Sequence, residues 1–344
     1  MKHLFFRLVL IVSAIAIILG CGDDEPKSES APHSVAVFVP GVVAGSPTYE
    51  ALVAGVESAA AERDGTTVKV VEGGFNQGEW IDGVTALAAS GIYDTIITSN
   101  PALPEICEQV ALQFPNQKFI VLDGHLSGNE SIHTIQYNQM EQSYLIGHLA
   151  GLISESTLPG ANPDLKVGLI AGQEYPIMNG VIRVGFELGM QAVDTAMSLD
   201  FRVLGNWYDA SRASELASIM YDSGVDVILA IAGGANQGVL SEARRRGTYV
   251  LWFDGNGYAE APGVVLGSSA LEQRRTAYEK ILAAIDGSVP YGSAEVVGVA
   301  DGYVTFIEDD PLYIEHVPEA IRSAQSALVK EITSGKLRLA MPRM

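Results

Sequence analysis

The feature of this sequence that most constrains its fold is a regular alternation of short apolar runs with longer amphipathic stretches, beginning at Ser34. Most of the apolar runs are continuous and rich in β-branched residues, as in parallel strands that are buried on both faces. Eleven runs are predicted strands: 35–39, 68–71, 95–98, 118–123, 132–137, 167–171, 199–204, 227–231, 249–254, 264–268 and 295–299. Between them lie predicted helices: 49–63, 79–90, 104–114, 141–154, 179–192, 211–223, 236–246 and 272–286.

This alternation predicts an α/β fold in which right-handed crossovers join the strands of parallel sheets. Eleven strands are many for one sheet, and the sequence changes character near residues 135–140 and again near 254–258. We therefore expect two lobes, each a parallel sheet flanked by helices. The expected boundaries are 34–137 plus 255–290 for the first lobe and 138–254 plus 291–344 for the second. The carboxyl ends of both sheets should then face a shared cleft, where ligands of such sheets bind.

The first residues have the pattern of an export signal that ends in a lipid attachment site. Lys2 and Arg7 precede an apolar run over 8–19, which is shorter than the roughly 20 residues of a membrane-spanning helix. Gly20 and Cys21 then complete a lipobox pattern, although an ordinary signal peptide with an incidental cysteine is the alternative. We expect residues 1–20 to be a lipoprotein signal peptide and 21–33 to be the lipidated cysteine with a flexible, polar tether. The expected location is the periplasmic face of a bacterial membrane, held there by the lipid.

Charge and cysteine content exclude several classes of partner. The formal net charge of −20 repels nucleic acid and anionic headgroups, so neither is an expected ligand. Once Cys21 is lipidated, Cys107 has no disulfide partner, and its place in a predicted helix indicates a small buried hydrophobic residue.

Polar residues follow several predicted strands at the point where each strand ends. Any one of them is a natural turn or helix-capping residue, because Asn and Asp favour those positions. As a set they could instead supply hydrogen bonds to hydroxyl groups and ring edges of a ligand. The candidates are Asn100, Asp123, Asn138, Asn236, Asp254 and Asn256.

Enzymatic signatures are missing from the sequence. It contains no G-x-G-x-x-G after the first strand, no Walker A lysine and no G-x-S-x-G elbow. The six histidines lack metal-ligand spacing, and no acid, base and nucleophile converge. We therefore expect a protein that is not an enzyme, without a catalytic cofactor or a metal.

Four segments resemble the basic membrane protein family of lipoproteins, which includes purine-nucleoside receptors of ABC importers. They are KFIVLDG at 118–124, QSYLIG at 142–147, MYDSGVDVI at 220–228 and AIAGGANQGV at 230–239. The resemblance extends from Ser34 to Leu337 in order and spacing. It implies a type I periplasmic-binding-protein fold with three hinge crossovers and a ligand enclosed between the lobes.

The sequence departs from nucleoside-binding members of that family at positions that would contact the ligand. Their aspartate at the end of the first strand falls on Val39, and their phenylalanine and asparagine fall on Thr48 and Tyr49. Their ribose-binding lysine falls on Leu271, beside Glu272 and Gln273, and their stacking phenylalanine falls on Trp207. Asp123 and Asp254 are retained.

These departures remove charges that would hold a ribose and enlarge the aromatic surface. Tyr49 and Trp207 could enclose a wide planar ring system, and the Asp and Asn residues could bind ring edges and a polyol. The sequence is thus similar to the riboflavin-binding branch of the family, which implies riboflavin as transported ligand and an ABC permease and ATPase as partners. Tyr49 as a core aromatic, a purine nucleoside as ligand, and a surface receptor or sensor without transport are the alternatives.

Overall fold

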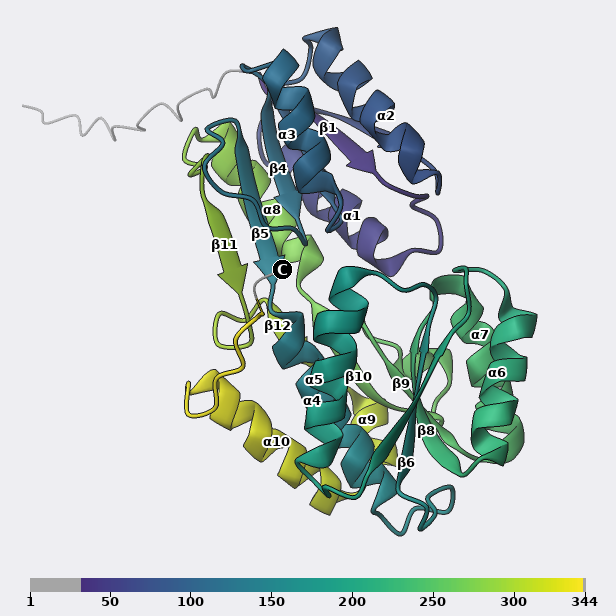
Figure 1. The fold of residues 1–344 in the computed structure, drawn as a ribbon. Coiled ribbons are helices and arrows are strands. Elements are labelled where there is room, and N and C mark those ends of the chain that lie inside the picture. The colour runs from purple at the N-terminus through teal and green to yellow at the C-terminus, as the bar shows by residue number, and fades with distance from the viewer. Residues whose placement is uncertain (1–31, 343–344) are drawn as a thin grey trace, which may run out of the picture.

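The computed structural model describes residues 32–342, in which two six-stranded sheets form two lobes (Figure 1). The predicted signal peptide, Cys21 and most of the tether lie outside the described residues. The first lobe contains β1 (Ser34–Val39), α1 (Pro47–Ala61), β2 (Thr67–Glu72), α2 (Gln77–Ser90), β3 (Thr95–Ser99), α3 (Leu103–Gln113), β4 (Lys118–Leu122), β5 (Ile132–Tyr137), α8 (Gln273–Ile285) and β11 (Ala294–Val297).

The second lobe is built from the middle and the end of the chain. It contains α4 (Gln139–Ser154), β6 (Lys166–Ala171), η1 (Met178–Ile182), α5 (Arg183–Gln191), β7 (Ser198–Val203), α6 (Ala210–Asp222), β8 (Val225–Ile231), η2 (Gly233–Ala235), α7 (Asn236–Arg246), β9 (Tyr249–Trp252), η3 (Tyr258–Glu260), β10 (Val265–Leu271), β12 (Val304–Phe306), α9 (Pro311–His316) and α10 (Glu319–Thr333).

The sheet of the first lobe has the order β11-β5-β4-β3-β1-β2, and every pair in it is parallel. Side chains alternate between its two faces, as strand geometry requires. Val35, Val37 and Val39 join the core that includes α1 and α8, whereas Ala36 and Phe38 join a second core with α2 and α3. Both faces are therefore covered, which explains why the predicted strands are continuous apolar runs.

The sheet of the second lobe has the order β12-β10-β9-β8-β6-β7, and only the short β12 is antiparallel to its neighbour. Helices α4 and α5 cover one side of this sheet, and α6 and α7 lie on the other (Figure 1). Every residue of the central strand β8 is buried. Cys107 in the first lobe is also fully buried and free, as predicted, and burial raises the pKa of its thiol.

The chain passes between the lobes three times, and two of these crossings differ from the expected boundaries. Range 255–290 was expected in the first lobe, but β10 within it pairs with β9 of the second sheet. Range 291–344 was expected in the second lobe, but β11 pairs with β5 of the first sheet. The crossings therefore follow β5, β10 and β11. The reason for the difference is that an apolar run identifies a strand without identifying the neighbour with which it pairs.

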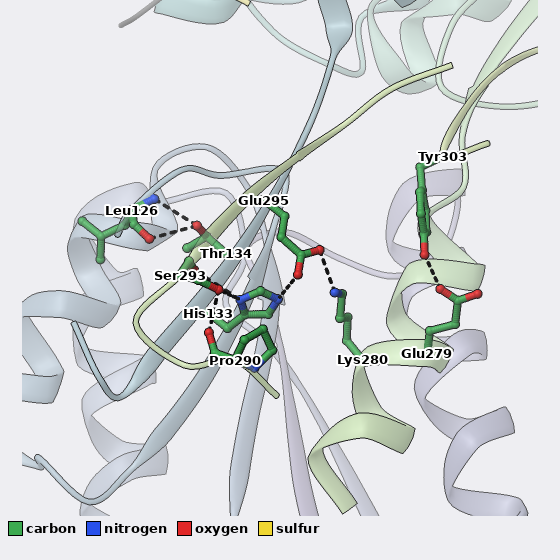
Figure 2. A network of polar contacts seen from close by, with 9 residues as sticks. All are labelled: Leu126, His133, Thr134, Glu279, Lys280, Pro290, Ser293, Glu295 and Tyr303. Atoms are coloured by element: carbon green, nitrogen blue, oxygen red, sulfur yellow. Dashed lines mark hydrogen bonds and ion pairs between the residues drawn. The ribbon is translucent and has the colours of Figure 1, made fainter. Parts of the chain in front are cut away.

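A polar network beside the crossings ties α8 to the strands and loops around it (Figure 2). Lys280 on α8 donates to Glu295 on β11 at 2.8 Å, and Glu295 also lies 3.5 Å from the buried His133 on β5. Tyr303, in the segment between β11 and β12, donates to Glu279 on α8. These contacts hold the middle of α8 against β11 and the segment that follows it.

Most predicted elements are present within a few residues of their expected bounds. The strands 35–39, 118–123 and 132–137, for example, correspond to β1, β4 and β5. Strand β12 and helices α9 and α10 were not among the predicted elements. No helix in residues 32–342 has the length and apolar character needed to cross a bilayer.

The contact between α1 and α8 generates a prediction, because Gly55 on α1 has no room for a side chain. A Cβ placed there would lie 2.3 Å from the Arg274 carbonyl oxygen on α8. Gly55→Val should lower the free energy of unfolding by about 1–3 kcal/mol, measured by urea denaturation. Gly78→Ala on α2, where the nearest atom would be 3.4 Å away, is the control and should cause no loss. Equal stability of the two variants would contradict the close packing.

Candidate ligand-binding site

Two aspartates occupy equivalent places at the carboxyl ends of strands in the two lobes. Asp123 follows β4 and Asp254 lies just beyond β9, with left-handed φ angles of 56° and 61°. Aspartate is among the few residues other than glycine that adopt this conformation readily. In each case the next N–H donates back to the neighbouring strand, to the carbonyl of Ile135 at 3.3 Å or of Ser269 at 3.0 Å. The sharp turn thus leaves each carboxyl group at the end of its sheet.

The two carboxyl groups are close enough to influence each other across the lobes. Burial raises the pKa of Asp123 well above its usual range, and the charge of Asp254 raises it further. Burial also raises the pKa of Asp254, to about 6, although the amide of Gln142 donates to its Oδ1 at 3.0 Å and opposes this rise. No cationic side chain contributes to either shift. Such a pair suits a neutral ligand that offers hydroxyl or N–H donors.

Aromatic side chains of the second lobe lie beside this pair. The rings of Trp207 and Tyr175 are 6.5 Å apart between centroids, at 43° to each other. Burial raises the pKa of Tyr175, and the charges of Asp254 and Asp123 raise it further. Trp207 packs on Gly172, where a Cβ would lie 2.4 Å from its Cε3. A glycine at position 172 is therefore what allows the indole to lie flat on the end of β6.

The first lobe contributes Tyr49 and Asn100. The Tyr49 hydroxyl donates to the Pro40 carbonyl at 3.2 Å. Burial raises its pKa to about 12, while the nearby Asn100 amide lowers it and the charge of Asp123 raises it. Tyr49 also packs against the main hydrophobic core, which agrees with the alternative that it is a core aromatic residue. Its pKa nevertheless responds to Asp123, so it lies near the candidate site as well. Thr48 lies half-buried next to it in the first turn of α1.

Three other candidate residues use their side chains for structural hydrogen bonds. Asn138 caps α4 through the Glu141 N–H and donates to the Leu339 carbonyl at 2.8 Å. Asn236 accepts from the Ala232 N–H at 2.8 Å in the turn before α7. Asn256 is exposed and donates to Asp310 at 2.8 Å. These contacts agree with the turn and capping roles that were the alternative for each residue, so we leave the three out of the candidate site.

Sequence reasoning missed two residues that the structure brings to the site, Tyr175 and Gln142. Tyr175 lies in a loop shortly after β6, and its position past the end of a strand was the available signal. Gln142 lies in the first turns of α4, where its sequence gives no sign that it reaches Asp254. Residues 32–342 contain no group of three or more His, Cys, Asp or Glu side chains that could hold a metal ion.

Residues 33–338 match the sequence model of the Bmp family, described as ABC transporter substrate-binding protein PnrA-like. The chain belongs to this family. The predicted resemblance to the basic membrane proteins is therefore confirmed.

Individual relatives match shorter parts of the chain. A CD4+ T-cell-stimulating antigen of Listeria monocytogenes is 30% identical over 152 residues, which cover 44% of this chain and 40% of the relative. An ABC transporter nucleoside-binding protein BmpA of Lactococcus lactis is 25% identical over 143 residues, 42% of this chain and 38% of the relative. The match thus spans about two fifths of the length of these relatives. Basic membrane protein A of Borreliella afzelii is 22% identical over 66% of this chain and 69% of its own length.

Solved structures confirm the predicted two-lobed fold. An ABC transporter solute-binding protein of Aeropyrum pernix K1 superposes with a TM-score of 0.78 at 20% identity, covering 91% of this chain and 94% of that one. A solute-binding protein of Conexibacter woesei gives a TM-score of 0.67 at 19% identity, with 90% and 98% covered. At this identity the likeness establishes the fold alone.

The raised pKa of Asp254 predicts an unusual dependence of stability on pH. Because the folded protein holds this proton more tightly than the unfolded chain does, stability falls as pH rises from about 4 to 7. Asp254→Asn removes the buried charge and keeps an acceptor for Gln142. At pH 8 the variant should be more stable than the wild type by up to about 3 kcal/mol, and the difference should shrink toward pH 4.

Urea unfolding at several pH values measures this effect. Asp222→Asn is the control, because its effect on stability should have the opposite sign. The Arg246 guanidinium lowers the pKa of Asp222, so its charge stabilises the fold above the unfolded pKa, and this stabilisation is lost at lower pH. Asp222→Asn should therefore reduce stability at neutral pH. An Asp254→Asn variant that is less stable than the wild type at pH 8 would show that its carboxylate has a cationic partner.

Proposed function

We propose that this protein is the substrate-binding lipoprotein of an ABC importer and that it captures riboflavin between its lobes. The observation that supports this most is the pairing of Trp207 with Tyr175, whose pKa responds to two carboxyl groups that have no cationic partner within residues 32–342. An aromatic wall binds a flat ring system by stacking. Carboxyl groups whose charge is costly to bury gain most from a neutral ligand that offers hydrogen-bond donors.

Riboflavin matches this combination because it joins a three-ring isoalloxazine to a chain of hydroxyl groups. The indole of Trp207, held on Gly172, is the larger of the stacking surfaces of the second lobe. Asp123 and Asp254 would accept hydrogen bonds from the hydroxyl chain or from a ring N–H. Tyr49 and Asn100 would limit the site on the side of the first lobe.

A purine nucleoside is the second candidate, and a specific observation favours it. The relative from Lactococcus lactis carries the description nucleoside-binding, and it matches 42% of this chain. A nucleoside also joins a flat ring to hydroxyl groups. Competition between riboflavin and inosine for the purified protein separates the two ligands.

The proposed cycle begins with lobes that are apart. A ligand favours the closed form because only there does it contact residues of both lobes. The closed protein would then dock on a permease, whose ATPase partner drives import. A lipid on Cys21 would hold the protein near the permease and raise its local concentration. A receptor without transport remains the alternative of another class, and uptake of labelled riboflavin lost on deletion of the protein would exclude it.

The first experiment is to produce residues 22–344 in a host rich in flavin and to record visible absorption and tryptophan fluorescence. Flavin bands that co-purify with the protein, together with quenched tryptophan emission, would support riboflavin as ligand. A colourless protein whose emission does not respond to added riboflavin would contradict the proposal and leave the nucleoside as the ligand to test.

Stacking on Trp207 predicts an order of effects among variants of the site. Trp207→Ala should weaken riboflavin binding by roughly 30-fold or more, because it removes the main stacking surface. Asp254→Ala should weaken it less. The adjacent Tyr208, which is 78% exposed, provides the control, and Tyr208→Ala should leave affinity nearly unchanged. Isothermal titration measures all three, and a larger loss for Asp254→Ala than for Trp207→Ala would count against stacking as the dominant contact.

A further inference from the structure

Six of the ten buried side-chain atoms that lack a hydrogen-bond partner within residues 32–342 belong to the carboxyl ends of first-lobe strands or to the first turns of helices beside the crossings. They come from the end of β3 (Thr98 and Ser99), from the end of β5 (Tyr137), from Gln142 on α4 and from Gln273 at the start of α8. An unsatisfied buried polar atom costs about 1–3 kcal/mol, and native proteins hold few of them. The other four belong to His133, Asp226, Thr248 and Tyr313, so the six beside the crossings are candidates for groups that a bound molecule satisfies.

Gln273 differs from the others because both atoms of its amide lack a partner. The residue is 2% exposed, and neither Nε2 nor Oε1 forms a hydrogen bond within residues 32–342. Gln325 on α10 shows the usual arrangement for a buried glutamine. Its Nε2 donates to the Leu145 carbonyl at 2.9 Å, and its Oε1 pairs with His148 at 2.8 Å. Gln273 therefore offers a free donor and a free acceptor side by side.

Gln273 is the first residue of α8 and lies directly after β10, where the chain crosses from the second lobe to the first. Helices α1 and α8 run in the same direction, because Ser58 contacts Arg274 and Arg63 contacts Asp286 further along both helices. The start of α8 packs beside Gly55 and Ser58 in the second half of α1, and it directly follows β10, at the second crossing between the lobes.

A neighbour on the same helix lies near Tyr137. Thr276, three residues after Gln273, lies on the same face of α8, since residues three apart are neighbours on a helix. Burial raises the pKa of the Tyr137 hydroxyl, the nearby Thr276 side chain lowers it, and the charge of Asp123 raises it. Tyr137 and Asp123 lie at the ends of the neighbouring strands β5 and β4, and α8, which begins with Gln273, contacts β4.

We propose that Gln273 determines specificity by reading an N–H and an adjacent carbonyl on the edge of the ligand's ring. Its Oε1 accepts from the ring N–H, and its Nε2 donates to the ring carbonyl. In riboflavin these groups are N3–H and a neighbouring carbonyl of the pyrimidine ring. The identity of the ring rests on the proposed function. The same pair of hydrogen bonds could form with any heterocycle that has an N–H beside a carbonyl.

Such a contact discriminates more strongly than stacking does. An aromatic wall accepts any flat ring, whereas a buried amide rejects a ring that leaves its donor or acceptor unpaired. Methylation at N3 removes the ring N–H and adds bulk at the same point. The wild-type protein should therefore prefer riboflavin to 3-methylriboflavin by roughly tenfold or more.

The test compares both flavins on the wild type, on Gln273→Leu and on Gln273→Met, using isothermal titration and thermal unfolding of the ligand-free protein. Both variants should bind riboflavin roughly tenfold more weakly and lose most of the preference against 3-methylriboflavin. They should unfold at the same temperature as the wild type or higher, because they replace polar atoms that have no partner. A preference that survives in both variants would overturn the proposal.

Gln325→Leu is the matched control, since it removes an equally buried amide whose partners lie within the protein. It should lower the unfolding temperature and leave the preference between the two flavins unchanged. A lower unfolding temperature for the Gln273 variants, with the preference intact, would assign Gln273 a structural role instead.

Failure of the proposed function gives a different result from failure of this inference. If the wild type binds no flavin, riboflavin is excluded, and the same variants are compared with inosine and 1-methylinosine, which differ by one ring N–H beside a carbonyl. Loss of that preference in Gln273→Leu would support the role of Gln273 with a nucleoside as ligand. The role of Gln273 is contradicted if the wild type binds riboflavin or inosine without preferring the form with the free N–H. It is also contradicted if the wild type binds neither ligand.

Discussion

The candidate site depends on the approach of two carboxyl groups that neither lobe neutralises. Each one follows a strand, on a residue with left-handed backbone conformation. Burial raises the pKa of both, and the charge of Asp254 raises that of Asp123 further. A salt bridge would have removed this cost and fixed the lobes together without a ligand. Gln142 donates only an amide hydrogen bond to Asp254. The two carboxyl groups can therefore still accept hydrogen bonds from a neutral ligand.

The fold was largely predictable from the sequence because burial on both faces of a parallel sheet leaves a strong local signal. Runs such as 35–39 and 227–231 are apolar throughout, and strands β1 and β8 form at these positions. The assignment of strands to lobes was less predictable. Strand pairing is decided by long-range packing, and the apolar composition of β10 is the same whichever sheet it joins.

The site was predictable in part for a related reason. Asp123, Asp254 and Trp207 lie at strand ends or in the loops after them, where the sequence pattern and the family resemblance both pointed. The asparagines had the same local pattern, but Asn138 and Asn236 use it for capping and turn bonds. Tyr175 and Gln142 reach the candidate site through the packing of their loop and helix, and the role proposed for Gln273 depends on packing in the same way. None of this is visible in the local sequence. A glutamine in the first turn of a helix is ordinarily exposed, so only its measured burial distinguishes Gln273.

Each sheet contains strands from distant parts of the chain, and this affects the order in which the chain can fold. The sheet of the first lobe gains its edge strand β11 at residues 294–297, and that of the second gains β12 at 304–306. Neither sheet is complete until nearly all of the chain is present, and Asn138 at the first crossing binds the carbonyl of Leu339. Contacts between such distant residues form slowly, because a long loop must close first. The protein therefore acquires its native pairing late, after synthesis or export of almost the whole chain, and until then exposes the edges of two unfinished sheets to chaperones and proteases.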